Sequence, residues 1–473
     1  MTRHRRWKCG TAPAAAALAT WVAALGGSSA AATPAAEEQG AAPAAEPNLA
    51  APDDSADAQI DPFAKIAELE ARLDQQQSVI IGRQPRVIVG GYLDLGFFAA
   101  QGNGSGIVRD QGNVLFPQYA GRYGWVFLGD ILSPAVNTRG EVADLGDATG
   151  APPRFDSIHS GGAPGFIANE INLNLTSGLG PSAIATASIN FTPRSGSNFS
   201  LGDFFDADIA QLEWMPTRSQ RTSIFVGKFD SVLGIEYRER KSNQRYGITP
   251  SLIARYTTGT ALGLKIRSKF GPDDLLVLAA SVTNGSFTQE QFHFYDEIDT
   301  NLGKTASGRV SLHPPIPIDM ELGASGSYGA QDRSPNSAGK MWFAGVDYQI
   351  HTRHADLKAQ YLKGRAPGDP TYDVYGLELH GGGYVELDGF LMSHLGVLAR
   401  AEYRDAFVWL GDPNALGGAD RAYLTKSWRA TGGVHINFTD RIILKAEYLY
   451  NGEYDGIPHI NNNVITSSLV LIE

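Results

Sequence analysis

From residue 86 to the end, apolar and polar residues alternate along much of the chain. In residues 260–270 the apolar side chains share one face and the charged side chains share the other. The apolar face carries Leu262, Leu264, Ile266 and Phe270, and the charged face carries Lys265, Arg267 and Lys269. The same period of two returns in residues 355–364, 395–404, 428–438 and 442–450. Because successive side chains of a β-strand point to opposite faces, this pattern predicts an all-β protein.

The links between the predicted strands alternate between short and long. Residues 270–274 and 350–354 form short turns, whereas residues 284–304 and 405–425 form long polar links. Barrels of the outer-membrane type combine short turns on the periplasmic side with long loops outside. A soluble sandwich has no such regularity, and its inward face is apolar rather than repeatedly charged. We therefore predict a transmembrane antiparallel β-barrel over residues 86–473.

The pattern predicts a barrel of about sixteen strands. The predicted spans are 86–99, 165–177, 182–193, 205–215, 221–230, 259–270, 274–284, 304–314, 318–330, 340–351, 353–364, 374–388, 394–408, 425–439, 441–451 and 460–472. A barrel of this size leaves an aqueous lumen. Residues 123–130 and 251–256 could each form a further strand, so eighteen strands is the alternative count.

The first 32 residues have the parts of a secretory signal peptide. A basic start precedes an apolar stretch over residues 14–25, and small residues follow it. This order predicts export by the Sec route and cleavage after Ala30 or Ala32. Residues 33–62 contain no lysine or arginine and seven carboxylates among alanine and proline. This composition predicts a disordered acidic tether.

Residues 63–82 carry a coiled-coil pattern. Ile66, Leu69, Leu73 and Ile80 follow one another at steps of three, four and seven residues, which is the spacing of a coiled-coil seam. The pattern covers only about two heptads, so a single amphipathic helix is the alternative. A trimeric barrel would help such a short coil to form, because it already holds three copies close together.

Composition removes several classes of protein. After residue 32 no apolar run reaches the roughly 18 residues of a helical membrane span. Cys9 is the only cysteine and lies in the predicted signal peptide, which excludes disulfides and cysteine-bound metal sites. The net charge of −11 makes nucleic acid an improbable partner. No metalloprotease, hydrolase or P-loop motif occurs, so we expect no cofactor and no enzymatic activity.

Four short motifs give the chain a resemblance to a known family. They are GYLDLG at 91–96, VGKF at 226–229, TG at 258–259 and VTNG at 282–285. From about residue 63 onwards, the chain resembles the coiled-coil-bearing outer-membrane porins of Gram-negative bacteria. The resemblance implies a location in the bacterial outer membrane, contact with its lipid, and a homotrimer. The chain differs from these porins at Glu473, where they carry an aromatic residue that serves as the barrel-assembly signal.

Two long links between strands are candidates for narrowing the lumen. Residues 231–256 contain a basic cluster interspersed with tyrosines, namely Arg238, Arg240, Lys241, Arg245 and Arg255. Residues 101–165 contain an acidic group, namely Glu141, Asp144, Asp147 and Asp156. A basic cluster that faces acidic residues across a narrow pore selects small solutes by size and charge. The alternative is that both segments are extracellular loops that face water.

The predicted inner wall carries charges of both signs. Its candidate cations are Lys265, Arg267, Lys269, Arg400, Arg404 and Lys445. Ion pairing on a wet wall is the ordinary role of such residues, and a slight basic excess near the constriction would favour anions. The chain lacks the continuous arginine ladder of a phosphate-selective channel. We therefore expect a channel for passive diffusion of small polar or charged solutes. The alternative is a structural or adhesion barrel plugged by its long loops.

Overall fold

The computed structural model describes ten parts of the chain. They are residues 87–100, 135–137, 165–191, 205–217, 219–288, 301–330, 340–366, 375–410, 421–455 and 463–473. The predicted signal peptide, acidic tether and coiled-coil segment lie outside the described residues. In these parts of the chain, no helix has the length and apolar character needed to span a membrane.

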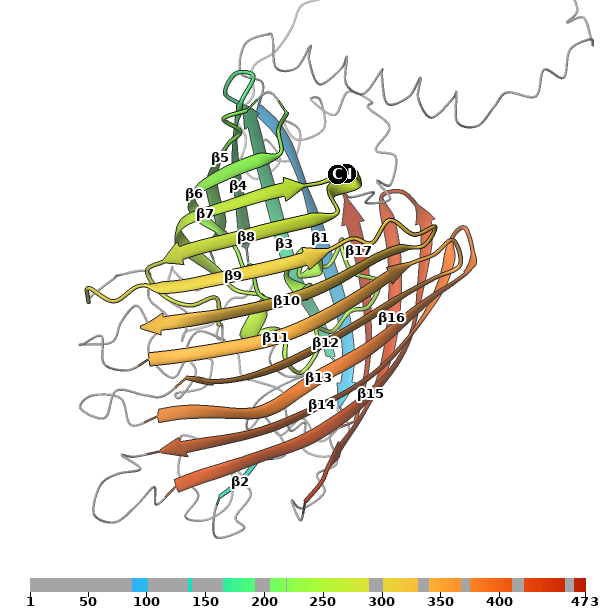
Figure 1. Cartoon of the computed structure of the whole chain (residues 1–473). Helices are drawn as coiled ribbons and strands as arrows, with labels where there is room; N and C mark the ends of the chain where they lie inside the picture. The colour runs from blue at the N-terminus through green and yellow to red at the C-terminus, as the bar shows by residue number, and fades with distance from the viewer. Residues whose placement is uncertain are drawn as a thin grey trace, which may run out of the picture. The chain divides into compact units, whose positions relative to one another are not determined.

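Sixteen long strands form the wall of a barrel (Figure 1). They are β1 (Val87–Ala100), β3 (Gly165–Gly178), β4 (Ala183–Phe191), β5 (Phe205–Trp214), β6 (Thr222–Asp230), β7 (Thr260–Phe270), β8 (Leu276–Thr283), β9 (Thr305–Leu312), β10 (Asp319–Ala330), β11 (Lys340–His351), β12 (Ala355–Ala366), β13 (Tyr375–Met392), β14 (Leu395–Leu410), β15 (Arg421–Thr439), β16 (Ile442–Glu453) and β17 (Val464–Ile472). Each pairs antiparallel with its neighbours, and β17 pairs with β1, so the wall closes on itself. A three-residue strand, β2 (Ala135–Asn137), pairs with one end of β15.

The predicted count of sixteen strands is confirmed, and each strand end lies within four residues of its predicted place. Residues 251–256, one candidate for a further strand, lead instead into a single helical turn, α4 (Ala254–Thr257). They could not extend the wall because they lie between β6 and β7, which pair directly with each other. The other candidate, residues 123–130, lies outside the described residues.

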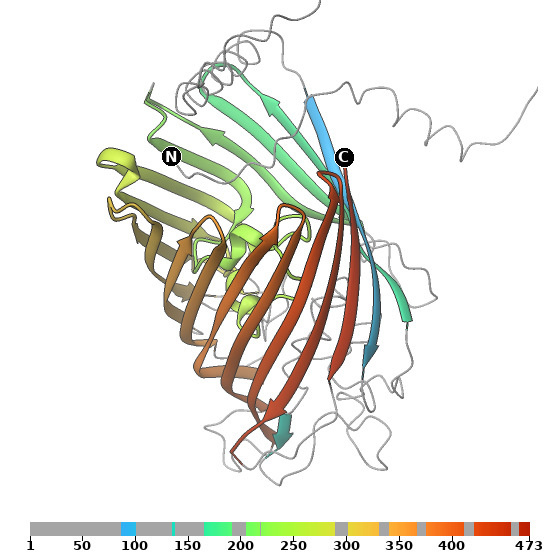
Figure 2. The same cartoon turned by 90° about the vertical axis from the view of Figure 1, so that its right-hand side faces the viewer.

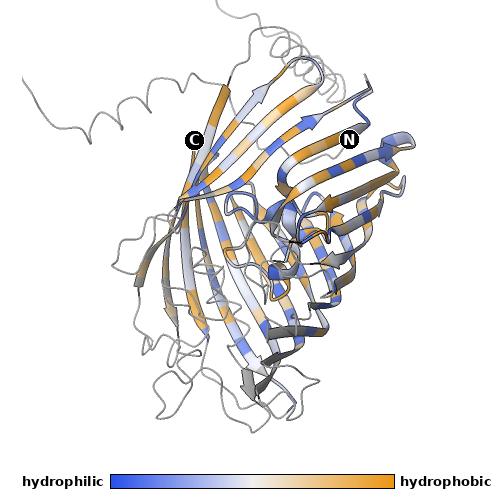
Figure 3. Ribbon diagram, turned by 90° about the vertical axis from the view of Figure 1, so that its left-hand side faces the viewer, coloured by the Kyte–Doolittle hydropathy of each residue, from blue (hydrophilic) through white to orange (hydrophobic). Residues whose placement is uncertain are grey.

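Cross-strand register separates an apolar outer face from a polar inner face. Leu264 on β7 lies opposite Val226 on β6 and Val282 on β8, and all three side chains are about half exposed. An outward apolar band of this kind faces lipid in transmembrane barrels. The other face of the strands carries buried polar side chains such as Lys358 and Arg400. Figure 3 shows the resulting alternation of hydrophobic and hydrophilic residues along the strands.

The link between β6 and β7 does not leave the barrel but folds into its interior (Figure 2). We call residues 231–259 the inward segment. It contains a 3-10 turn, η4 (Glu236–Glu239), and the helical turn α4. The Ser231 N–H donates to Gly259 O at 3.2 Å and so joins the two ends of the segment. The segment is therefore a closed loop whose base lies at the ends of β6 and β7.

Apolar packing holds the base of the inward segment against the wall. Phe225 and Phe229 of β6 form a buried cluster with Val232, Ala261 and Phe287. Such burial removes apolar surface from water and favours the docked position of the segment.

Candidate functional site

The inward segment contacts opposite walls of the barrel. Glu239 accepts a hydrogen bond from Lys358 on β12 at 2.6 Å, and Lys241 donates to Ser188 on β4. In the closed ring of sixteen strands, β4 and β12 lie eight strands apart. Glu239 and Lys241 are two positions apart, a distance of at most about 7 Å along extended chain, so both contacts lie at about the same level of the barrel. The inward segment therefore bridges the interior of the barrel at this level.

The first anchor of the segment is Arg240, whose side chain is 4% exposed. Its guanidinium donates to both carboxylate oxygens of Asp208 on β5, with Nη1 at 2.7 Å from Oδ1. Its Nε donates to Asp230 at 2.6 Å. Lys241 Nζ lies 3.6 Å from the same Asp208 carboxylate. Paired guanidinium and carboxylate groups of this geometry form strong, directional hydrogen bonds, so two cations and two carboxylates make a buried, charge-balanced group.

A second anchor joins the segment to β9, β10 and β11. Arg238 donates two hydrogen bonds to Glu321 at 2.6 and 2.9 Å. Arg309 donates to Glu321 at 2.8 Å and to both oxygens of Asp347 at 2.6 Å. Arg309 also donates to the backbone oxygen of Gly234. These contacts again pair two cations with two carboxylates.

Gly234 makes this approach to the wall possible. Its φ is +67°, a left-handed conformation that glycine adopts without strain. A Cβ at this position would lie 2.4 Å from the side-chain amide of Gln360. Gln360 Oε1 accepts a hydrogen bond from the Ile235 N–H at 3.0 Å. A residue with a side chain would therefore push the segment away from β12.

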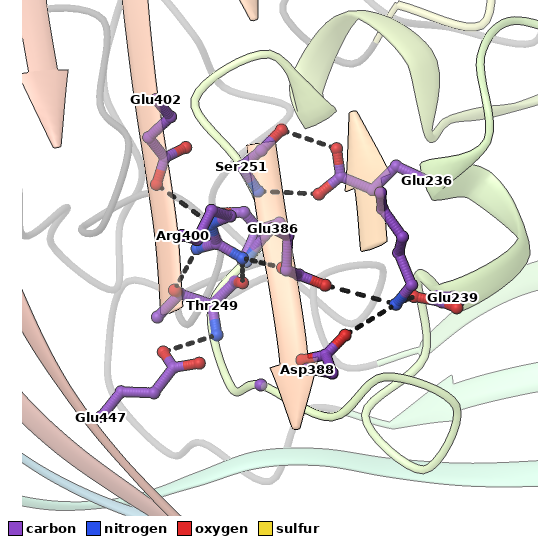
Figure 4. Close-up of polar contacts among 12 residues, drawn as sticks. Glu236, Glu239, Thr249, Ser251, Glu386, Asp388, Arg400, Glu402 and Glu447 are labelled. Atoms are coloured by element: carbon purple, nitrogen blue, oxygen red, sulfur yellow. Dashed lines mark hydrogen bonds and ion pairs between the residues drawn. The ribbon is translucent and has the colours of Figure 1, made fainter. Parts of the chain in front are cut away.

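The third anchor is Lys358 on β12. Its ammonium lies 2.6 Å from Glu239, 3.2 Å from Glu386 and 3.3 Å from Asp388 (Figure 4). Glu386 in turn accepts a hydrogen bond from Arg400 at 3.1 Å. The side chain of Lys358 is only 3% exposed. Because a buried charge is tolerated only when it is paired, Lys358 binds the segment by neutralising carboxylates from both the segment and the wall.

The wall also binds the backbone of residues 247–252. Glu447 accepts hydrogen bonds from the N–H groups of Ile248 and Thr249 at 2.6 and 3.1 Å. Arg400 Nη1 donates to Thr249 O at 2.9 Å. Glu402 accepts from the Leu252 N–H at 2.6 Å. Since these contacts go to the main chain, they fix the path of the segment independently of its side chains in this stretch.

Lys445 on β16 holds the turn that precedes this stretch. Its ammonium donates to the backbone oxygens of Ser242, Arg245 and Gly247 at 2.5, 2.6 and 3.1 Å. The residue is 1% exposed. Three carbonyl oxygens satisfy its three donors, so Lys445 is enclosed by the segment.

Burial changes the acid–base properties of two groups on the segment. Burial raises the pKa of the Glu236 carboxyl, and two hydrogen bonds from Ser251 offset part of this effect. Burial likewise lowers the pKa of the Lys241 ammonium, while the charge of Asp208 opposes this change. Both shifts follow from removing a charged group from water.

The five predicted constriction cations all lie on the inward segment, but the structure distributes them. Arg238 and Arg240 bind β10 and β5, as described above. Arg245 is half-buried and donates to Arg240 O at 3.2 Å. Arg255 is buried within α4. They do not form one exposed patch, because carboxylates of different strands bind different members.

The six predicted wall cations occupy different settings. Arg400 and Lys445 bind the segment, and Arg404 is fully buried. Lys269 pairs with Asp274 at 2.8 Å in the turn η5 (Pro272–Asp274) between β7 and β8. The two others, Lys265 and Arg267, contact aromatic rings of β6. The predicted acidic group, Glu141, Asp144, Asp147 and Asp156, lies outside the described residues.

Sequence reasoning missed the carboxylates that anchor the segment. It interpreted the wall charges of both signs as ordinary ion pairs and did not single out Glu321, Glu402, Glu447 or Asp208. One signal was available. Carboxylates recur on the polar face of several strands, while the link between β6 and β7 is rich in cations. Each class of charge requires partners once water is excluded. Within the described ranges, no group of three or more histidine, cysteine or acidic side chains is arranged to hold a metal ion.

Comparison with known proteins gives a family and several structures of similar fold. The family described as "Putative beta-barrel porin-2, OmpL-like" matches residues 168–472. The outer-membrane channel DcaP of Acinetobacter baumannii is 10% identical, with a TM-score of 0.49 over 82% of this chain and 97% of that chain. OmpF of Salmonella typhi, solved with daunomycin, is 11% identical, with a TM-score of 0.47 over 82% and 97%. The trimer form of OmpT of Vibrio cholerae is 10% identical, with a TM-score of 0.46 over 83% and 100%. No curated protein matches the sequence.

Proposed function

The chain belongs to this family of β-barrel porins of the bacterial outer membrane, and we propose that it forms a water-filled channel for passive diffusion of small polar or charged solutes. A closed barrel of sixteen strands encloses an aqueous lumen. The observation that carries the proposal is the inward segment, which reaches both β4 and β12 inside that ring. A segment in this place narrows the lumen and so limits the size of the solutes that pass.

In this proposal the inward segment is a fixed constriction rather than a mobile loop. It is bound through Arg240, Arg238, Lys358 and the backbone of residues 247–252, on strands distributed around the ring. Transport by diffusion needs no cofactor and no bond making. We also propose a homotrimer in contact with outer-membrane lipid, with the coiled-coil segment of residues 63–82 joining the three chains.

A second candidate function is a structural or adhesion barrel whose interior is plugged. The observation that favours it is the burial of the segment, in which every residue from 247 to 258 is buried. The two functions share one geometry and differ in whether water and ions cross the level of the segment.

Single-channel recording in planar bilayers tests the proposal. Full-length protein purified in mild detergent should give stable ion conductance, and each inserted unit should close in three equal steps if it is a trimer. Neutral polymers of graded size, added to both sides, should lower the conductance only below the size that enters the constriction. A correctly folded protein that inserts without conducting would refute the channel and support the plugged barrel. One closing step per unit would refute the trimer alone.

A further inference from the structure

Lys265 differs from the wall cations that bind the inward segment. It lies in the middle of β7 and is half-buried. Its ammonium donates to Asp230 O at 3.2 Å and lies 4.6 and 4.7 Å from the ring centres of Phe225 and Phe229. No carboxylate of the described residues lies within ion-pair distance of it. A backbone oxygen and two aromatic rings hold the ammonium in place, but none of them carries a compensating charge.

The neighbouring cations are neutralised or enclosed. Arg240 and Lys241 are balanced by Asp208 and Asp230. In the same way, the two arginines of the second anchor are balanced by its two carboxylates. Lys445 is closed off by three carbonyl oxygens. Lys265 is therefore the one among these cations that has no carboxylate in ion-pair contact and is also partly accessible.

The ionisation of Tyr237 on the inward segment agrees with a positive local field. Burial by itself would raise the pKa of this phenol, but the charges of Arg238, Arg309 and Lys265 lower it below its ordinary value. Tyr237 lies in η4, so the field of Lys265 acts on the inward segment.

We propose that Lys265 sets the ion preference of the constriction and attracts small anions to it. The inference rests on the channel function proposed above and makes it more specific. Arg238, Arg240 and Lys241 of the inward segment serve to dock it, because they are paired with wall carboxylates. Lys265 instead presents a fixed positive charge beside the segment, and such a charge raises the local occupancy of anions and repels cations. The effect weakens at high salt, because the screening length falls from about 10 Å at 0.1 M to about 3 Å at 1 M.

Reversal potentials across a KCl gradient test this assignment. Lys265→Gln should lower the permeability ratio of chloride to potassium about fivefold near 0.1 M. In water, one charge about 5 Å away changes the occupancy of each ion about fourfold, in opposite directions for chloride and potassium, and a screening length of about 10 Å reduces the effect on each ion to about twofold. Lys265→Arg should keep the ratio, since it keeps the charge. Lys426→Gln is the matched control. It makes the same change in net charge, but Lys426 pairs at 2.8 Å with Asp455, a largely exposed residue that follows β16.

The outcomes separate this inference from the function on which it rests. A Lys265→Gln variant that conducts with an unchanged chloride-to-potassium permeability ratio would refute the role of Lys265 and leave the channel function intact. An equal change of the permeability ratio in the Lys426→Gln variant would also refute the role of Lys265, because the effect would then depend on the net charge of the protein and not on the position of the charge. Absence of conductance in the natural protein would refute the channel, and this inference with it. Unchanged heat-dependent mobility in gels would show that each variant is folded.

Discussion

Removing Asp208 should release the inward segment while the barrel stays folded. Asp208 is fully buried and binds Arg240 through both of its oxygens. In Asp208→Leu, Arg240 and Lys241 would share Asp230 as their remaining carboxylate in this group. The wall strands keep their own hydrogen bonds, because β5 pairs through its backbone with β4 and β6.

The size of the effect follows from burial. Removing one partner of a buried ion pair costs about 3–5 kcal/mol. Because Arg240 keeps its hydrogen bond to Asp230, we expect a cost near the lower end of this range. A cost of about 3 kcal/mol lowers the ratio of docked to undocked segment by more than about a hundredfold. In Asp208→Leu combined with Arg240→Met, one cation and one carboxylate remain. Apolar replacement of both partners is often nearly neutral, so the double variant should recover most of the docking.

Amide hydrogen exchange, measured by mass spectrometry, reports the undocking of the inward segment. In the natural protein, the N–H groups of Ile248 and Leu252 are bound by Glu447 and Glu402 and should exchange slowly. Asp208→Leu should speed exchange across residues 231–259 and raise single-channel conductance, and the double variant should reverse both changes. Slow exchange in Asp208→Leu, or a double variant as damaged as the single one, would refute the account of this anchor.

Two further predictions concern the wall. Leu264→Arg should reduce the yield of folded, heat-modifiable barrel, because a charge facing lipid at the bilayer midplane costs about 2–4 kcal/mol. Lys265→Ser should fold normally, and equal tolerance of both would mean that the two faces of β7 are wrongly assigned. Gly382→Ala should speed amide exchange around α4, because its Cβ would lie 2.6 Å from Cγ2 of Ile253. Gly432→Ala, which meets nothing within 4 Å, is the control, and equal exchange in the two variants would contradict this packing.

Strand positions and faces were predictable from the sequence because both are local properties. A period of two in residues 260–270 assigns Leu264 and Lys265 to opposite faces without knowledge of any partner strand. The register of β6, β7 and β8 then places Leu264 beside Val226 and Val282 on the apolar side. The basic link between β6 and β7 could also be recognised from composition and length alone.

The partners of the charges in that link could not be predicted, because closing the barrel decides them. Lys358 meets Glu239 across 119 positions of sequence, and Lys445 meets Ser242 across 203. No local pattern fixes which strands lie opposite each other at the height of the segment. The sequence by itself determined a sixteen-strand barrel with a cation-rich link. The tertiary structure decided that most of those cations are paired with wall carboxylates and that Lys265 is not. The reason is that the pairing of a charge inside the barrel depends on the groups within a few ångströms of it, and closure of the ring brings those groups from distant strands.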